Sequence, residues 1–263
     1  MAKLIVRLNW LWRLFATGLA FTVFGVGGML LPLYALPILL LTPAGVARER
    51  RARWLVHVNF KAFMHMMQGL GIMRFDARHL DDLRRPGQLI LANHPSLIDV
   101  VFLISVLPQA DCVVKANLLK NPTMRGVIGL AGYIANNDPE QVLEAARASL
   151  RRGNSLIIFP EGTRTVPGKP IRMQRGAANV ALRLGQPIRP VLITVEPDTL
   201  TKHRPWYQIP ADGPFTMRLT AMPELPVSSV YEHMPPALAA RKLTRSLEDY
   251  FTEELRTHGV AGT

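Results

Sequence analysis

The chain has 263 residues, of which 49% are hydrophobic, and its formal net charge is +12 at pH 7. This length accommodates one α/β domain with an N-terminal appendage. The positive charge favours an anionic membrane or a nucleic acid as partner. We find no RNP-type aromatic pattern and no zinc-finger spacing, so we expect an anionic membrane surface and no nucleic acid. The single cysteine, Cys112, excludes an intrachain disulfide, as is typical of a reducing compartment.

The N-terminal segment is long and apolar, because residues 14–47 contain no Lys, Arg, Asp or Glu. As a single helix this segment would extend about 50 Å, which exceeds one membrane span but is too short for two. Turn-forming residues lie in its middle: Gly25, Gly27, Gly28, Pro32 and Pro37.

Basic residues flank this segment at both ends, and such residues prefer the cytoplasmic side of a membrane. They are Lys3, Arg7, Arg13, Arg48, Arg50, Arg51 and Arg53. We therefore predict a membrane-embedded helical hairpin over about residues 10–47. It would place the protein at the cytoplasmic face of the inner membrane. A single tilted span and a cleaved signal peptide remain the alternatives.

The next segment, about residues 48–69, has apolar residues at helical spacing with basic residues between them. Such a helix can lie at the membrane interface or can cover the core of the domain. The predicted organisation is a membrane-associated helical part, residues 1–70, followed by an α/β domain, residues 71–263.

The second part of the chain alternates short apolar runs with helical patterns. The predicted strands are Ile72–Ala77, Gln88–Ala92, Ala110–Val114, Ser155–Phe159, Ile188–Val195 and Phe215–Ala221. The predicted helices are Ile98–Val106, Thr123–Leu130, Pro139–Arg152, Arg172–Leu184 and Pro236–Arg256. Asp138 is expected to cap the helix that begins at Pro139, and Gly153 to end it. This alternation predicts an α/β fold with a mainly parallel central sheet and helices on both faces.

Two polar clusters follow predicted strands. The first, Asn93-His94-Pro95-Ser96-Leu97-Ile98-Asp99, holds an imidazole and a carboxylate five residues apart. Histidine is suited to proton transfer near neutral pH, and a carboxylate can orient it, as in a catalytic triad. No Gly-x-Ser-x-Gly nucleophile elbow is present, so the base would act on a hydroxyl of the substrate. A pair at this spacing can equally serve as a cap or as core polar residues.

The second cluster, Phe159-Pro160-Glu161-Gly162-Thr163-Arg164, follows the predicted strand Ser155–Phe159. Arginine binds phosphate through two parallel hydrogen bonds, and glycine lets the backbone approach a ligand closely. Taken together and in this order, the two clusters resemble the glycerolipid acyltransferase family. The likeness is greatest to bacterial 1-acyl-glycerol-3-phosphate acyltransferases.

This resemblance implies a role for each motif residue. His94 would be the general base and Asp99 would orient it, while Glu161, Gly162, Thr163 and Arg164 match the acceptor-binding motif. Lys115 matches a basic position that the family uses near the acceptor phosphate. The implied reaction transfers an acyl group from acyl-CoA or acyl-carrier protein to a membrane lipid acceptor, and it needs neither a metal nor a cofactor.

One position departs from the family pattern: Asn136 stands where arginine is common. Asparagine is neutral and cannot form the same charge-assisted hydrogen bonds. A lyso-lipid with another headgroup, such as a lyso-amino-acid lipid, is therefore an alternative acceptor. A non-catalytic lipid-binding protein and a lipid hydrolase are the alternative functions.

Overall fold

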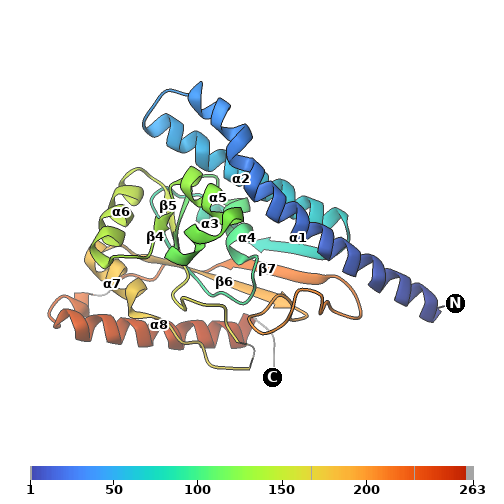
Figure 1. Ribbon diagram of the computed structural model, residues 1–263. Coiled ribbons are helices and arrows are strands. Elements are labelled where there is room, and N and C mark those ends of the chain that lie inside the picture. The colour runs from blue at the N-terminus through green and yellow to red at the C-terminus, as the bar shows by residue number, and fades with distance from the viewer. Residues whose placement is uncertain (1, 167, 228, 259–263) are drawn as a thin grey trace.

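The central feature of the computed structural model is a seven-stranded sheet with the strand order β1-β7-β6-β2-β5-β3-β4 (Figure 1). The structure describes residues 2–166, 168–227 and 229–258. The strands are β1 Met73–Arg78, β2 Leu89–Ala92, β3 Ala110–Val114, β4 Ile134–Ala135, β5 Ser155–Ile158, β6 Ile188–Glu196 and β7 Phe215–Ala221. Neighbouring strands are parallel except β6 and β7, so the predicted mainly parallel sheet is confirmed.

Helices cover both faces of this sheet, as predicted. The longer ones are α1 Ala2–Leu40, α2 Val46–Gly69, α4 Asp99–Val106, α5 Pro122–Ala131, α6 Pro139–Arg151, α7 Arg175–Leu184 and α8 Pro236–His258. Short helices are α3 Leu80–Leu83, η1 Ala116–Lys120 and η2 Ser229–Tyr231. One apolar cluster joins α1, α2, α4 and α5 to one face of the sheet, and a second joins α6, α7 and α8 to the other.

A local signal accounts for the start of α6, and tertiary contacts decide the start of α7. The Asp138 carboxylate accepts hydrogen bonds from the N–H groups of Glu140 and Gln141, both at 2.9 Å, and so caps α6 as predicted. Helix α7 begins at Arg175, three residues later than predicted. The N–H of Met173 bonds to Glu248, and that of Gln174 bonds to the Pro160 carbonyl at 2.7 Å. These tertiary contacts hold the preceding segment outside the helix.

The predicted hairpin over residues 10–47 is wrong. Helix α1 runs without interruption from Ala2 to Leu40, and the chain reverses only after it, before α2 begins at Val46. Two of the residues interpreted as turn signals, Gly28 and Pro32, instead lie in the close contact between α1 and α5. A Cβ atom on Gly28 would clash with the Thr123 carbonyl oxygen, and one on Gly126 would lie 2.5 Å from Cγ of Pro32. Small residues allow helices to approach in this way.

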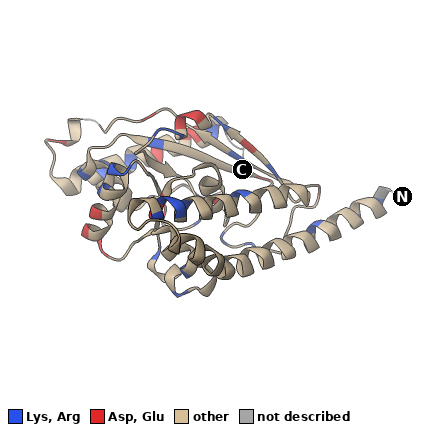
Figure 2. Ribbon diagram, turned by 90° about the horizontal axis from the view of Figure 1, so that it is seen from above, with Lys and Arg blue, Asp and Glu red and all other residues tan. Residues whose placement is uncertain are grey.

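Helix α1 keeps one apolar face exposed. It is the one helix in the described residues long and apolar enough to cross a membrane, and only 17% of its most apolar window is buried. Figure 2 shows that most of α1 lacks charged residues, whereas charges are spread over the domain. Its other face packs against α2 and α5.

Helix α2 covers the core with a buried face that includes Val56, Phe60 and Met64. This burial supports the core-covering interpretation of its amphipathic pattern. The division into residues 1–70 and 71–263 remains a prediction, and the turn between α2 and β1 lies at that boundary.

Candidate active site

The sheet order brings the two polar clusters together. Strands β2 and β5 are parallel neighbours, with Leu91 paired to Ile158, and β3 lies on the other side of β5. The loops that follow these three strands therefore meet at the carboxyl edge of the sheet, where open α/β folds bind their ligands. These loops carry His94, Arg164 and Lys115 respectively.

His94 and Asp99 form the predicted pair. The distance between His94 Nδ1 and Asp99 Oδ2 is 2.7 Å. The Asp99 side chain is fully buried and also accepts hydrogen bonds from the N–H and the hydroxyl of Ser96, each at 2.7 Å. A carboxylate held by these donors keeps the proton on Nδ1, so Nε2 presents its lone pair to the substrate side. The predicted contact is confirmed, and the catalytic roles remain predictions.

The buried Glu161 carboxylate connects the two clusters by hydrogen bonds. Its carboxylate accepts a hydrogen bond from the His94 N–H at 2.8 Å and from the Thr165 hydroxyl at 2.8–2.9 Å. The Thr165 N–H in turn bonds to the His94 carbonyl at 2.7 Å. Burial raises the pKa of Glu161, and the hydrogen bonds from His94 and Thr165 act in the opposite direction. The structure therefore places Glu161 behind His94, outside the cavity lining, and its acceptor-binding role remains a prediction.

The other predicted residues border one cavity. Gly162, Thr163, Arg164 and Lys115 all line it together with His94. Gly162 has a φ of +64°, which a residue with a side chain rarely adopts. One guanidinium nitrogen of Arg164, Nη1, donates to the carbonyls of Leu200 and Thr201 at 2.9 and 3.1 Å. This leaves Nε and Nη2 for a ligand.

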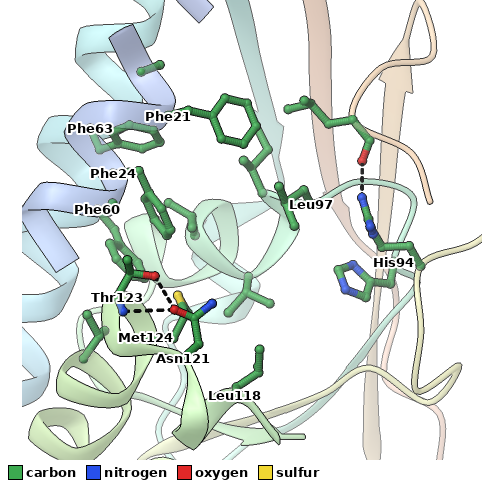
Figure 3. Close-up of a pocket in the computed structure, with 18 of the residues that line it drawn as sticks. Phe21, Phe24, Phe60, Phe63, His94, Leu97, Leu118, Asn121, Thr123 and Met124 are labelled. Atoms are coloured by element: carbon green, nitrogen blue, oxygen red, sulfur yellow. Dashed lines mark hydrogen bonds between the residues drawn. The ribbon is translucent and has the colours of Figure 1, made fainter. Parts of the chain in front are cut away.

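The cavity has a volume of about 630 Å³ and is mainly apolar. Figure 3 shows four phenylalanines on one side and His94 on the other. The phenylalanines are Phe21, Phe24, Phe60 and Phe63, from α1 and α2. The imidazole also lies against the Phe159 ring, with ring centroids 4.6 Å apart. A long apolar group bound in the cavity would therefore begin next to His94.

Among the hydrogen-bond partners of the motif residues, Ser96, Thr165 and Leu200 were not predicted from the sequence. Ser96 lies within the first motif and Thr165 directly follows the second, so the presence of a hydroxyl group near each motif could have indicated them. Leu200 comes from the loop between β6 and β7, and no sequence pattern indicates it. Asn136 lies beside Lys115, because Val114 pairs with Ala135 in the β3–β4 ladder.

Comparison with known proteins finds a family model that matches part of the chain. Residues 74–194 match the model of the Acyltransferase family, and this range contains both polar clusters. The predicted resemblance to glycerolipid acyltransferases is therefore confirmed.

The chain is similar to several 1-acyl-sn-glycerol-3-phosphate acyltransferases. It is 27% identical to that of Cocos nucifera, over 60% of this chain and 52% of that protein. It is 28% identical to that of Pseudomonas aeruginosa, over 45% of this chain and 49% of that protein. The chain thus spans about half the length of the curated relatives it matches.

A solved structure shares the whole fold. The 1-acyl-sn-glycerophosphate acyltransferase PlsC from Thermotoga maritima superimposes with a TM-score of 0.65 at 21% sequence identity. The match covers 97% of this chain and 99% of that chain. The N-terminal helices therefore belong to the shared architecture.

Proposed function

We propose that this protein is an acyltransferase. It transfers a fatty acyl group from acyl-CoA or acyl-carrier protein to the free hydroxyl of 1-acyl-glycerol-3-phosphate and forms phosphatidic acid. The observation that carries the proposal is the His94–Asp99 pair, at 2.7 Å, on the wall of an apolar cavity beside Arg164. The names of the relatives support the acceptor.

In this reaction His94 Nε2 takes the proton of the acceptor hydroxyl. The hydroxyl oxygen then attacks the thioester carbonyl carbon and forms a tetrahedral oxyanion. Collapse of this intermediate breaks the carbon–sulfur bond, and the imidazolium returns its proton to the leaving thiolate. Asp99 stabilises the imidazolium through Nδ1. Neither a metal nor a cofactor is required.

The polar edge of the cavity provides the other groups. Arg164 and the exposed Lys115 supply positive charge for the acceptor phosphate. The N–H of Gly162 donates to the Phe159 carbonyl at 3.1 Å and is already engaged. The next amides, those of Thr163 and Arg164, are the candidates that stabilise the oxyanion.

Membrane association follows from α1. Moving an acyl chain from the bilayer into water costs about 0.8 kcal/mol of free energy for each CH₂ exposed. The exposed apolar face of α1 would hold the cavity, which α1 itself lines, at the bilayer surface. We propose the cytoplasmic face of the inner membrane, where either acyl donor is available.

Substitution His94→Ala tests the proposal. We expect acyl transfer to fall by at least about 10²-fold, because a positioned base contributes this much or more. Thiol release from acyl-CoA in the presence of lysophosphatidic acid measures the rate. His65→Ala is the matched control, since His65 is an exposed histidine of α2 outside the cavity lining. Equal rates for His94→Ala and wild type would refute the catalytic assignment.

The acceptor is tested by a screen of lyso-lipids. Arg164 and Lys115 lie at the polar edge of the cavity with His94, and their positive charge suits the phosphate of lysophosphatidic acid. We therefore expect lysophosphatidic acid to be the best acceptor. A faster reaction with a lyso-amino-acid lipid would make that lipid the acceptor in place of lysophosphatidic acid. Thiol release without any acceptor would indicate a hydrolase. No release with any lyso-lipid would indicate a lipid-binding protein.

A further inference from the structure

The loop between β6 and β7, residues 197–214, connects the candidate site to the apolar helix α1. Its first part lines the cavity through Thr199 and Leu200, and its last part does so through Ile209 and Pro210. The sequence motifs do not include this loop, and the acyl-transfer mechanism above gives it no role.

On the site side, the loop holds both motifs through its backbone. The Leu200 carbonyl accepts hydrogen bonds from the Leu97 N–H at 3.1 Å and from Arg164 at 2.9 Å. Leu200 has a φ of +54°, which is rare for a residue with a side chain. Such backbone strain tends to occur at functional sites, where the surroundings enforce it.

On the membrane side, the same loop is fastened to α1. The buried guanidinium of Arg13 donates to the carbonyls of Pro210, Ala211 and Gly213. A Cβ atom on Gly18 would lie 3.5 Å from the Trp206 indole, and this indole lies against the Phe21 ring, with centroids 5.7 Å apart. The position of the loop is therefore tied to that of α1.

The outer surface of the loop is aromatic and basic. Trp206 and Tyr207 are 43% and 54% exposed, and their ring centroids lie 5.9 Å apart. Lys202 and Arg204 are exposed beside them. Trp206 also continues an apolar stripe of α1, because Leu11 and Phe15 are exposed and precede Gly18 by seven and three residues, which places them on the same helical face.

We propose that residues 202–207 form a second membrane contact, in which Trp206 and Tyr207 enter the headgroup region of an anionic bilayer. Tryptophan and tyrosine prefer this region because they combine an apolar ring with a polar group. Lysine and arginine beside them add attraction to anionic lipids. Membrane contact by the loop also fixes the position of Arg164, because Arg164 donates hydrogen bonds to the carbonyls of Leu200 and Thr201 in the same loop. The effect of this positioning on the reaction rests on the proposed acyltransferase function.

The occupant is a bilayer and not an acidic carrier protein, because the exposed aromatic rings continue the apolar face of α1. An acidic carrier protein would account for the basic residues but not for an apolar surface that continues the exposed face of α1. The net charge of +12 suits either partner, so it does not decide between them.

Fluorescence quenching tests the surface itself. The full chain with Trp10→Phe, Trp12→Phe and Trp54→Phe retains Trp206 as its single tryptophan. With vesicles of brominated phosphatidylglycerol, we expect Trp206 emission to fall at least twofold relative to vesicles of unbrominated lipid. Unchanged emission while the protein floats with the vesicles would overturn the proposal, and so would failure to bind anionic vesicles.

Kinetics test the connection to the site. Trp206→Ala should raise the KM for lysophosphatidic acid in phosphatidylglycerol vesicles at least threefold with kcat within twofold, and Trp206→Phe should restore most of the loss. Gln208→Ala, an exposed control in the same loop, should match wild type. A KM unchanged by Trp206→Ala, or raised only for acyl-carrier protein as donor, would overturn the connection. Because quenching requires no activity, its result stands even if the chain transfers no acyl group.

Discussion

At the scale of single residues, the buried carboxylate of Glu161 connects the two motifs. It accepts hydrogen bonds from the His94 N–H and the Thr165 hydroxyl, and so joins the loop after β2 to the loop after β5. The backbone of His94 is thereby held on one side while Asp99 orients its ring on the other. Two carboxylates therefore position the His94 imidazole: Glu161 through the backbone and Asp99 through the ring.

Glu161→Gln should remove a pH dependence of stability. Burial raises the pKa of Glu161 in the folded protein above its unfolded value. Its contribution to stability is therefore complete below the unfolded pKa and is lost as the pH rises through the folded pKa. Glutamine stays neutral and can still accept the His94 N–H bond. We expect the thermal midpoint of wild type to decrease, relative to that of Glu161→Gln, between about pH 4 and pH 8.

The exposed Glu144 of α6 supplies the control. Glu144→Gln should shift the thermal midpoint by the same small amount at both pH values, because its side chain is in solvent. A midpoint difference between wild type and Glu161→Gln that does not vary with pH would contradict the assignment of the burial effect to Glu161.

At the scale of elements, the contact of α1 with α5 decides the shape of the apolar N-terminal part. Gly28 and Gly126 lack side chains where the two helices cross, and Pro32 packs into the space at Gly126. A proline inside a helix removes one hydrogen bond and is tolerated in apolar helices when neighbours compensate. Helix packing therefore explains why α1 is continuous despite its glycines and prolines.

Gly28→Ala and Gly27→Ala form a matched pair. The added methyl of Gly28→Ala would meet the Thr123 carbonyl oxygen, so we expect destabilisation by about 1–3 kcal/mol, as is typical of overpacking. Around Gly27 no atom lies within 4 Å of a Cβ, so Gly27→Ala should be neutral or stabilise by up to about 1 kcal/mol. Unfolding followed by circular dichroism in detergent measures both, and equal effects would refute the packing argument.

At the scale of the whole molecule, charge and apolar surface are separated. Figure 2 shows few charges along α1, whereas basic residues are spread over the domain. On the proposed membrane association, the net charge of +12 would attract the protein to anionic lipid over long distances, and the exposed face of α1 would act by direct contact. The two contributions should respond differently to salt.

Raising the salt concentration from about 0.01 M to 1 M shortens the Debye length from about 30 Å to about 3 Å. We expect binding to phosphatidylglycerol vesicles, measured by flotation, to weaken at least tenfold without vanishing, since apolar contact persists. Binding to phosphatidylcholine vesicles should change little and serves as the control. Complete release from anionic vesicles at high salt would show that α1 does not enter the bilayer.

Much of the fold and several residues of the candidate site can be predicted from the sequence alone. The charge-free stretch from residue 14 to 47, the alternation of strands and helices, and the motif residues His94, Asp99 and Arg164 depend on local composition and spacing, which are visible along the chain. The six predicted strands all occur, and of the strands in the described part of the chain only the two-residue β4 was missed. So short a strand carries no periodic signal.

Tertiary structure decided the rest. Whether Gly28 and Pro32 form a turn or a packed helix depends on α5, about a hundred residues further along the chain, and Leu200 joins the site only through the path of a loop. Glu161 faces His94 because β2 and β5 are neighbours, which no local pattern specifies. Local propensity sets which conformations are available to a segment, and the packing of distant segments selects among them.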